Sequence, residues 1–458
     1  MIEARIISGE RWRISALSAG ICVFGMVASP LRAGVIVDPV TVSFTQVKGG
    51  AEISYTLGGD PAIVTMEIQT NTLANGAGDW VDIGGENVQH VSGDVNRIVR
   101  ETGTRRTIHW KASKDMPERI FKGGTIRAVL TAWATNAPPD YLVVGLRKAN
   151  DVRFYASTNY LPDGFSSDIY RTTHLLMRKI PAAGVVWKMG AVDGEGNRFN
   201  DSTRNDFDYD IQHNVMLTED YYMGVYEVTQ SQYTNMCNKS NPSVFQAYYE
   251  HAEVCAVNNV GMKALRGQTT AFGDGIWWPK TGHQVASDSA IGQLRTRSGL
   301  DEFDLPTAAQ WEFACRAGTT TAFNWGSNSV NRDYCWFDDT PSITDTDGKK
   351  YRIAQPVGMK KPNAWGLYDM HSNVEECCLD RLSWGDDYKS TFAKDWETGG
   401  VTVDPGGENV SSSTQIVKAG GSNAEGARQM RSGARWWGGW SYDSYFIGFR
   451  LWHPARFR

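Results

Sequence analysis

The cysteines are the residues of this chain whose chemistry depends most on their spacing. No two of them have the Cys-x-x-Cys spacing of zinc sites, and the two that are nearest in sequence, Cys377 and Cys378, are adjacent. Beyond residue 200 the cysteines are Cys237, Cys255, Cys315, Cys335, Cys377 and Cys378. An even number permits disulfides in an exported chain, and buried thiols are the alternative. The spacing leaves the pairing open.

A segment near the end of the chain is the second candidate for function, because it is rich in aromatic residues. It reads Trp436-Trp437-Gly438-Gly439-Trp440-Ser441-Tyr442-Asp443-Ser444-Tyr445-Phe446-Ile447. Rigid aromatic area beside small polar groups is typical of recognition surfaces. We therefore expect a ligand-binding face made of Trp436, Trp437, Trp440, Tyr442 and Tyr445. The alternative is that Trp436 and Trp437 cover the domain's own core.

Composition and charge narrow the class of protein. A chain of 458 residues is long for one core, so two folded units are expected. The net charge of -5, without a basic run interleaved with aromatics, argues against nucleic acid as a partner. The 17 Trp and 47 Gly indicate a loop-rich fold whose irregular segments are held by large side chains.

The first residues have the pattern of an export signal. Three arginines precede an apolar stretch from Ile14 to Ala28, and small residues follow it. The stretch is too short to span a bilayer comfortably. We expect residues 1–34 to be a cleaved signal peptide and the mature protein to be periplasmic, at the cell surface or secreted, with no membrane span. An uncleaved anchor is the alternative.

Residues 35–150 are predicted to form an all-β sandwich of immunoglobulin or fibronectin type. Short strands are expected at 42–45, 53–57 and 126–130, with glycine-containing turns between them. Val64, Met66 and Ile68 alternate with polar residues, which is the period of a half-buried strand. Residues 151–179 are predicted to be a connector.

From residue 180 to 458 the pattern predicts an α+β domain with long irregular loops. One helix is expected over residues 230–238 and another over 307–317, where Thr307 can cap the helix. The rest is rich in Gly, Asn and aromatic residues, with short strands. Loops of this length are commonly functional, or are held by disulfides or metal ions.

An ordered set of motifs in this region resembles the formylglycine-generating (sulfatase-modifying factor) family, over about residues 180–455. The motifs are Lys188-Met189-Gly190, His213 to Leu217, Tyr222 to Gln230, Asn241-Pro242-Ser243, Leu305 to Gly318, Pro362 to Val374, Gly420-Gly421-Ser422, Arg431 to Arg435 and Gly448 to Leu451. Each is weak alone, and their common order makes the resemblance specific. It implies a variant of the C-type lectin fold and leaves the function open, because one fold hosts many sites.

The resemblance also shows what this chain lacks. The family's oxidase binds copper(I) with two cysteines that follow the Gly-Gly-Ser motif, and thiolates are soft ligands suited to that ion. Here Ser422 is followed by residues 423–430 without a cysteine, and no cysteine occurs after Cys378. Met430 alone cannot replace two thiolates. We therefore expect no copper and assign no catalytic residue.

Calcium is the metal that the resemblance favours. In the family, a loop similar to residues 369–376 holds structural calcium, which implies side-chain oxygens from Asp369 and Glu376 and backbone oxygens from Ser372 and Val374. The family's Trp-Glu-Trp is Glu375-Glu376-Cys377 here, which is a departure. A loop stabilised by hydrogen bonds alone is the alternative.

Other polar residues of the family-like motifs are predicted to be structural. His213 is expected to be a structural strand residue and His371 a solvent-facing turn residue, since the scattered histidines do not form the cluster of an iron enzyme. Arg431, Arg435 and Arg450 are expected to pack their guanidinium groups in the interior.

The favoured function is non-catalytic recognition of an extracellular glycan, peptide or protein through the aromatic face. The alternative is an enzyme, either a diverged formylglycine-generating oxidoreductase or another metal-dependent enzyme. A concave pocket with convergent titratable groups or thiols would favour the enzyme.

Overall fold

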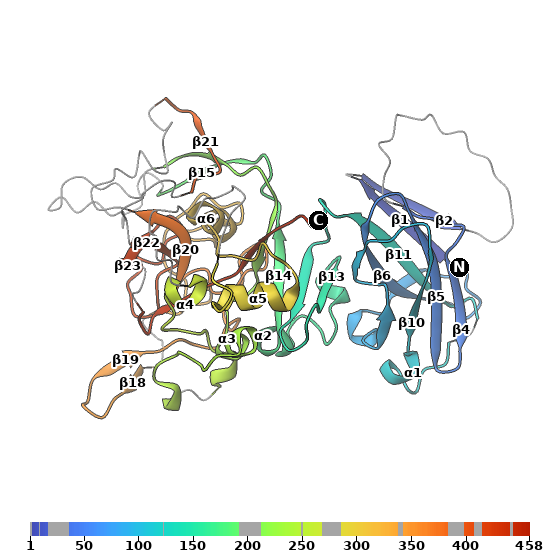
Figure 1. The fold of residues 1–458 in the computed structure, drawn as a ribbon, viewed down its shortest axis with the longest axis horizontal. Helices are drawn as coiled ribbons and strands as arrows, with labels where there is room; N and C mark the ends of the chain where they lie inside the picture. The colour runs from blue at the N-terminus through green and yellow to red at the C-terminus, as the bar shows by residue number, and fades with distance from the viewer. Residues whose placement is uncertain are drawn as a thin grey trace. The chain divides into compact units, whose positions relative to one another are not determined.

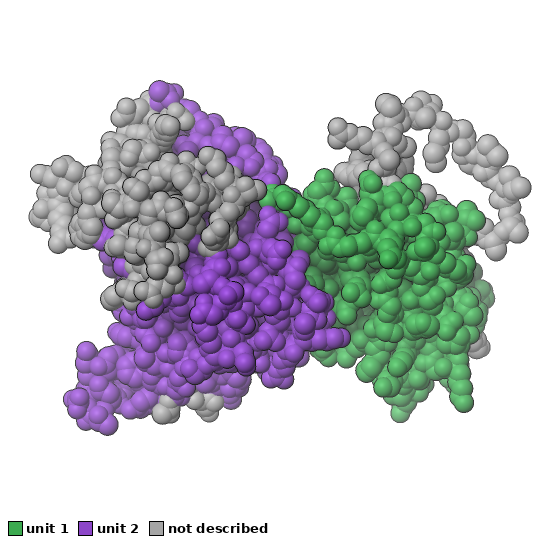
Figure 2. Space-filling view, viewed as in Figure 1, with its two compact units in different colours: residues 1–143, 152–167, 455–458 green, residues 144–151, 168–454 purple. Residues whose placement is uncertain are grey.

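The computed structural model describes residues 2–8, 10–16, 36–121, 123–191, 212–248, 251–267, 285–337, 342–382, 398–406, 415–439 and 443–458 (Figure 1). The chain divides into two compact units, coloured separately in Figure 2. Unit 1 comprises residues 1–143, 152–167 and 455–458, and unit 2 comprises residues 144–151 and 168–454.

The helices and strands are short and numerous. The strands are β1 Ile2–Ser8, β2 Glu10–Ala16, β3 Ile36–Val37, β4 Ser43–Val47, β5 Gly50–Gly58, β6 Ala62–Asn71, β7 Trp80–Asp82, β8 Val91–Gly93, β9 Arg97–Val99, β10 Arg105–Trp110, β11 Ile126–Ala134, β12 Tyr141–Gly145, β13 Val152–Tyr155, β14 His174–Ile180, β15 Val186–Met189, β16 His213–Met216, β17 Tyr221–Gly224, β18 Ser342–Thr344, β19 Lys350–Arg352, β20 Glu375–Leu382, β21 Val401–Val403, β22 Gln415–Ala419, β23 Trp436–Gly439, β24 Ile447–Gly448 and β25 Trp452–Pro454. The helices are α1 Ala112–Asp115, α2 Ile169–Thr172, α3 Gln230–Cys237, α4 Met262–Arg266, α5 Ala290–Ser298 and α6 Ala308–Arg316, with short 3-10 turns at Gly85–Asn87, Thr158–Tyr160, Gln246–Tyr248 and Ala252–Val254. In the described ranges, no helix is both long enough and apolar enough to cross a membrane.

Unit 1 is built from two sheets on one core. The first has the strand order β2-β1-β11-β6-β7, with β9 also paired to β6, and the second has the order β3-β5-β10-β8, with β4 also paired to β5. The core is shared by both sheets, since it joins Ile53 and Ile108 of the second sheet to Val64 and Leu130 of the first. In β5, buried and more exposed residues alternate, so that one face of the strand is directed to this core.

Strand β6 differs from the half-buried strand that the sequence predicts, because both of its faces are buried from Ala62 to Gln69. Two of its polar residues, Thr65 and Gln69, form hydrogen bonds within the unit. Thr65 Oγ1 accepts a hydrogen bond from Trp133 Nε1 at 2.9 Å, and Gln69 bonds Arg127 and Asp82. A polar residue on an alternating strand therefore need not face solvent, provided that its partner is buried with it.

Neither the predicted signal peptide nor the predicted connector forms a separate segment of the structure. Residues of the predicted signal form β1 and β2, and 17–34 lie outside the described residues, so cleavage and export stay predictions. The predicted connector is divided between the units. In unit 1, Phe154 of β13 packs on Phe457 with ring centroids 4.8 Å apart, whereas in unit 2 the carbonyl of Tyr170 in α2 accepts a hydrogen bond from Gln232.

Both predicted helices of unit 2 are confirmed, and each begins at a threonine. Thr229 and Thr307 are the N-caps of α3 and α6, and each forms a capping box with the glutamine three residues later. These reciprocal bonds satisfy backbone N–H groups that a helix leaves unpaired at its start. Helix α5 was not predicted, although Ser289 caps its start and Gly299 ends it in the left-handed region.

Three sheets of unit 2 position the family-like motifs. Strand β17 pairs with β14 and β25, and β16 pairs with β15 and β21. A four-stranded sheet has the order β23-β22-β20-β24. Helix α6 lies on the core that these sheets share, and Trp311 is buried there.

A buried ion pair network fixes α6 to two distant segments. Glu312 accepts hydrogen bonds from the Gly190 backbone N–H at 2.8 Å, from Arg316 Nε at 2.8 Å and from Arg435 Nη2. Burial disfavours the charged carboxylate, but the guanidinium groups of Arg435 and Arg316 outweigh it and lower the pKa of Glu312. The carboxylate is therefore ionised and compensated inside the protein.

We predict that Glu312→Gln lowers the free energy of unfolding by about 3–5 kcal/mol, because it leaves two buried guanidinium groups without their carboxylate. The ionised Glu312 carboxylate contributes fully to the stability of the native protein at pH values above its ordinary pKa of 4.5. This contribution is lost as the pH falls through the lowered pKa of the folded state. Urea unfolding at pH 7 and pH 4 measures both effects. The exposed Glu253→Gln is the matched control, expected to change stability by less than about 0.5 kcal/mol. Equal stability of the two variants would contradict the role of Glu312.

Candidate functional site

The loop that precedes β20 contains the predicted calcium ligands, and its backbone is unusual. Asp369, Ser372 and Asn373 have φ values of 56°, 81° and 65°, which non-glycine residues adopt rarely and at an energetic cost. Ser372 Oγ donates to the Trp336 carbonyl, and Ser372 N donates to the Gly420 carbonyl at 2.7 Å. Side-chain and backbone bonds thus hold the strained loop in place.

Three buried carboxylates surround this loop. Asp369, Glu227 and Glu376 are each 2% exposed or less. Glu227 accepts hydrogen bonds from Asn373 Nδ2 at 2.5 Å and from Val374 N at 3.1 Å. Burial raises the pKa of Asp369 to about 6, and burial followed by the charges of Asp369 and Glu376 raises the pKa of Glu227.

Arg450 is the guanidinium that compensates this group. Its Nε and Nη2 donate to the carboxylate of Glu376 at 2.7 to 3.1 Å, and Trp311 Nε1 donates to the same carboxylate at 2.7 Å. The remaining donors of Arg450 bond backbone carbonyls. The interior role predicted for Arg450 is confirmed, and the same holds for Arg435 through Glu312.

The calcium prediction can be tested against these oxygens. Asp369 Oδ2 accepts from the Gly358 N–H at 2.7 Å, whereas the buried Asp369 Oδ1 has no hydrogen-bond partner. An orphaned carboxylate oxygen inside the protein fits a hard cation. Glu376 fits less well, because Arg450 and Trp311 already bond its oxygens. Within the described residues, no three His, Cys, Asp or Glu side chains come together as a metal site, so a calcium ion here would depend on backbone oxygens such as those of Ser372 and Val374.

The six described cysteines are all buried thiols. Cys315 Sγ lies 3.6 Å from His371 Nε2 and 3.7 Å from Ser432 Oγ, and Cys335 belongs to a separate apolar cluster with Met430. Burial raises the pKa of Cys315 to about 12. The structure therefore agrees with the thiol alternative and shows no disulfide among the six.

His371 is a correction to the sequence analysis, because it is buried and not a solvent-facing turn residue. It is 1% exposed, and its Nδ1 bonds the Met430 carbonyl at 2.6 Å. Its Nε2 accepts from the Asn324 N–H at 3.1 Å. Burial lowers the pKa of His371 to about 4, which keeps the ring neutral. The aromatic rings of Phe323 and Trp325 enclose it.

The sheet β23-β22-β20-β24 separates the two tryptophans that begin the predicted aromatic face. Trp437 is opposite Val417 in the register, on the face that packs on the apolar core with Cys378. Trp436 is opposite Lys418, which is opposite Cys377, so these three residues share the other face. Trp437 therefore covers the core, which was the alternative for this residue.

Tyr445 belongs to a cluster of aromatic rings that the sequence did not reveal. We call Phe245, Tyr248, Tyr351, Tyr445 and Phe446 the aromatic cluster. Its ring centroids are 4.7 Å apart for Phe245 and Tyr351, 5.7 Å for Tyr351 and Tyr445, 5.1 Å for Tyr445 and Phe446, and 6.5 Å for Phe245 and Tyr248. Trp440 and Tyr442 lie outside the described residues.

The aromatic cluster is partly exposed and partly strained. Tyr248 is 45% exposed, and Phe245, Tyr351 and Tyr445 are half-buried. Phe245 has a φ of 60°, which is an outlier for a bulky residue and costs on the order of 1–3 kcal/mol. Such strain is retained where the surrounding structure over-determines it, and it is common at binding sites. No periodic signal links residues 245, 351 and 445, so only the tertiary structure identifies this cluster.

Beside the aromatic cluster lies a group of charged residues on the Trp436 face of the sheet. Lys418 Nζ forms an ion pair with Glu375 and lies 5.8 Å from the Phe446 ring centroid. Glu425, which is half-buried, accepts from the Ser422 N–H at 2.9 Å. Burial, followed by the charge of Glu375, raises the pKa of Glu425 to about 7. Glu425 stands in the stretch after Gly-Gly-Ser where the family's oxidase has its cysteines.

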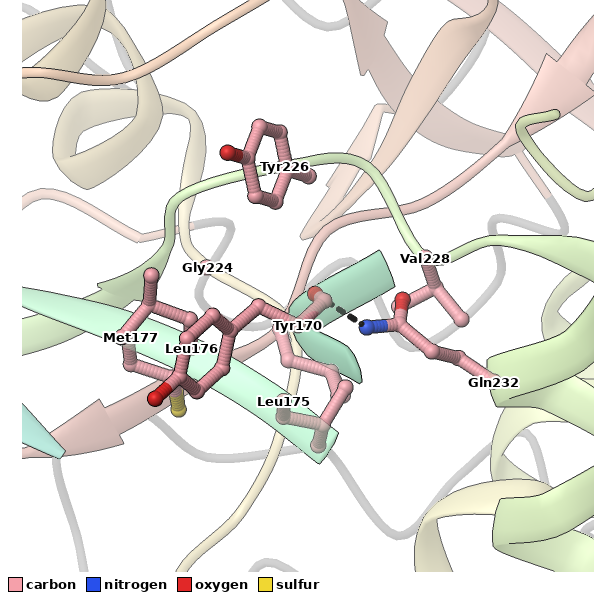
Figure 3. Close-up of a pocket in the computed structure, with 9 residues that line it drawn as sticks. Tyr170, Leu175, Leu176, Met177, Gly224, Tyr226, Val228 and Gln232 are labelled. Carbon is pink, nitrogen blue, oxygen red and sulfur yellow. Dashed lines mark hydrogen bonds between the residues drawn. The ribbon is translucent and has the colours of Figure 1, made fainter. Parts of the chain in front are cut away.

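A small cavity in unit 2 does not offer a ligand site. It is lined by Tyr170, Leu175, Leu176, Met177, Gly224, Tyr226, Val228, Gln232 and Leu451, and Figure 3 shows these side chains around it. Its volume is about 10 Å³, which is close to the minimum for one water molecule. Two of the lining residues are joined by a hydrogen bond of 2.9 Å from Gln232 Nε2 to the Tyr170 carbonyl.

Unit 2, with its capped helices, its short strands and the loop before β20, has the features of a sulfatase-modifying-factor domain. The family described as "Sulfatase-modifying factor enzyme 1-like domain" matches residues 183–454, which is more than half of the chain, and the chain belongs to this family. The resemblance found in the motifs is thereby confirmed.

Individual relatives match parts of the chain. The chain is 27% identical over 191 residues to the "Chaperone protein LppX" of Paenibacillus barcinonensis, covering 36% of this chain and 63% of that protein. It is 35% identical over 123 residues to the formylglycine-generating enzyme of Thermomonospora curvata, covering 26% and 37%, and 25% identical over 213 residues to that of Mus musculus, covering 40% and 55%. The matches thus span less than two thirds of each of these relatives.

Two solved structures are similar to the chain. Treponema denticola variable protein 1 is 24% identical, covers 61% of this chain and 95% of that chain, and has a TM-score of 0.40. PvdO from Pseudomonas aeruginosa is 20% identical, covers 61% and 94%, and has a TM-score of 0.42.

We predict that the six described thiols react slowly in the native protein. Burial raises the pKa values of Cys255, Cys315 and Cys377 from 9.0 to about 12, so their thiolate fractions at pH 8 are about 1000-fold below that of an ordinary cysteine. A thiol-specific chromogenic reagent should report these groups only after denaturation. Rapid reaction of one of them at pH 8, or a disulfide found by mass spectrometry, would contradict the buried-thiol arrangement.

Proposed function

We propose that the chain is a non-catalytic recognition protein of the sulfatase-modifying-factor family, which binds an extracellular glycan, peptide or protein. The observation that supports it best is the aromatic cluster, where three segments distant in sequence bring half-buried rings together around Tyr445. Rigid aromatic area that is partly exposed binds ligands at little entropic cost. The ligand-binding prediction is thus kept for Tyr445, Trp436, Trp440 and Tyr442 and extended to Tyr351 and Phe245.

The alternative, a formylglycine-generating oxidase, is supported less well. The chain has no cysteine after Cys378, and its thiols are buried with raised pKa values, whereas copper(I) binding requires accessible thiolates. A relative that carries the name of a chaperone protein is consistent with a family role other than oxidation. We infer that the native protein uses no copper.

Further proposals concern the fold types and location. A C-type lectin-like fold for unit 2 is supported by the family and by its short strands with long irregular loops. An immunoglobulin- or fibronectin-like sandwich for unit 1 is supported by its two sheets on one core. Export as a periplasmic, cell-surface or secreted protein is supported by the pattern of residues 1–34.

We also propose structural calcium at the loop before β20. Asp369 Oδ1 is the leading ligand, with the Ser372 and Val374 carbonyls and Glu376 as further oxygens. The ion would supply positive charge beside three buried carboxylates that share one guanidinium, and it would hold the strained loop.

We predict that Tyr445→Ala and Tyr351→Ala each weaken ligand binding by at least about tenfold, because each removes one ring of a cluster that acts as an anchor. The measurement is a glycan and peptide array probed with the native chain and each variant, followed by titration of the ligands retained. Tyr334→Ala is the matched control, since Tyr334 is a half-buried tyrosine that packs on Trp325 instead.

Two outcomes would count against recognition. One is ligand binding that is unchanged in both variants. The other is copper-dependent oxygen consumption by the native chain with a cysteine peptide, which would favour the oxidase function over recognition.

We predict that calcium stabilises the native protein, by about 2.7 kcal/mol when its concentration is 100 times the dissociation constant. Asp369→Asn should abolish the shift in Tm, because it removes the charge of the leading ligand. Asp345→Asn is the matched control, since Asp345 lies in an exposed acidic turn whose own backbone N–H groups satisfy it. A calcium response that survives Asp369→Asn and disappears in Asp345→Asn would place the ion in the wrong loop for this proposal.

A further inference from the structure

Unit 1 contains an apolar pocket that is separate from the aromatic cluster of unit 2. It lies beside α1, between the edge strand β4 and the segment from Trp110 to Phe121 (Figure 1). Its volume is about 180 Å³. Because an apolar cavity of about 150 Å³ can hold one benzene molecule, this pocket has room for one ring-sized apolar group.

The inner part of the pocket is made of side chains that the core already holds in place. Ala51, Trp110 and Ile126 line it and are buried. Trp110 packs on Phe121 with ring centroids 6.2 Å apart, and its Nε1 donates to Asp115 at 2.8 Å. The ring of Trp110 therefore has a fixed position at the pocket.

Two hydrogen bonds connect the opposite walls. Gln46 Nε2 on β4 donates to the carbonyl of Phe121 at 2.9 Å, and the backbone N–H of Ser113 in α1 donates to the carbonyl of Gly49 at 2.9 Å. These bonds keep the segment 112–121 beside the β4–β5 hairpin. The pocket is thus formed before a ligand arrives, which is typical of small-molecule sites.

The rim of the pocket presents apolar side chains to solvent. Ile120 is 94% exposed and Val47 is 39% exposed, and both line the pocket. A single exposed apolar residue needs no explanation, but these two stand at the mouth of one apolar pocket. An apolar group bound there removes part of their surface from water, which favours binding.

The charge at the pocket is positive. Among the described residues that line it, Arg119 alone is charged. Arg119 is exposed, its Nη1 lies 3.8 Å from Met116 Sδ, and it forms no ion pair with any residue that the structure describes. Lys48, Lys111 and Lys114 are exposed neighbours of lining residues in the sequence and add to the positive charge.

The nearby carboxylates do not cancel this charge. The side chain of Asp115 is 1% exposed and is bonded to Trp110 and His90. Glu52 follows Ala51 on the opposite face of β5, where it lies 3.5 Å from His109. Glu118 is exposed and does not line the pocket, so one free carboxylate stands against four cations.

We propose that this pocket of unit 1 binds a small amphipathic carboxylate. One ring-sized apolar group enters the pocket over Trp110, and its carboxylate lies at the rim, where Arg119 donates hydrogen bonds to it. A guanidinium group matches the geometry of a carboxylate. Because Arg119 is exposed, this pair adds a modest preference, and burial of the apolar group supplies most of the affinity. The inference is independent of the recognition function proposed for unit 2.

The test uses three probes of the same shape and different charge. They are 3-phenylpropionate, 3-phenylpropan-1-ol and 3-phenylpropylamine, titrated by ligand-observed NMR on the full chain at neutral pH and low ionic strength. The carboxylate should bind up to about fivefold more tightly than the alcohol, as expected for an exposed ion pair, and the amine should bind least. In about 1 M NaCl the preference should disappear while the alcohol still binds, because salt screens charges but not apolar burial.

Four variants assign the binding to residues. Arg119→Gln should bring the carboxylate to within about twofold of the alcohol, whereas Arg100→Gln, an exposed arginine outside the pocket, should keep the preference. Ala112→Phe places a ring in the pocket and should abolish binding of all three probes. Ile120→Ser removes apolar surface from the rim and should weaken all three. Circular dichroism checks the folding of each variant, and the exposed Ile120 gives a test that does not disturb the interior.

Several outcomes would overturn the inference. They are equal affinity of the native chain for the carboxylate and the alcohol, a preference that survives Arg119→Gln, and binding that survives both Ala112→Phe and Ile120→Ser. Absence of probe binding also overturns it, and a dimer that Ala112→Phe dissociates in sedimentation velocity would then identify a second copy of the chain as the occupant. None of these results bears on the aromatic cluster, whose role the array experiment decides.

Discussion

Unit 2 depends on a few charged side chains that are buried and compensated. Arg450 is the clearest case, because its guanidinium bonds the Glu376 carboxylate and the carbonyls of Gly224, Val225 and Tyr368. Replacing such a pair by apolar residues can be neutral, but removing one partner leaves an uncompensated charge. In a domain with short strands and long loops, these bonds connect segments that no continuous sheet joins.

The same constraint explains why the loop before β20 can remain strained. Three of its residues have left-handed backbones, and the carboxylates around it are buried. Glu227 holds Asn373 and the backbone of Val374, so the loop is fixed from the side of the family-like motif at 222–230. Among the described residues, the buried Oδ1 of Asp369 has no hydrogen-bond partner, and it is the oxygen at which we propose that calcium binds.

The two faces of the sheet β23-β22-β20-β24 separate stability from the proposed function. One face carries Cys378, Val417 and Trp437 into the core. The other carries Trp436 and Lys418, and Lys418 pairs with Glu375 and lies beside the Phe446 ring of the aromatic cluster. Because side chains alternate along a strand, the adjacent residues Trp436 and Trp437 lie on opposite faces of the sheet. A shift of one residue in the register would move each of these side chains to the other face.

The sequence by itself determined the family, through motifs in a common order, and the starts of α3 and α6, because a threonine cap acts on backbone groups three residues away. The sequence also shows that no cysteine follows Cys378, and our inference that the protein uses no copper rests on this observation. Only the tertiary structure decided the burial of His371, the separation of Trp436 from Trp437 and the meeting of Phe245, Tyr351 and Tyr445. These features arise from contacts between residues far apart in the chain, and local periodicity carries no information about such contacts.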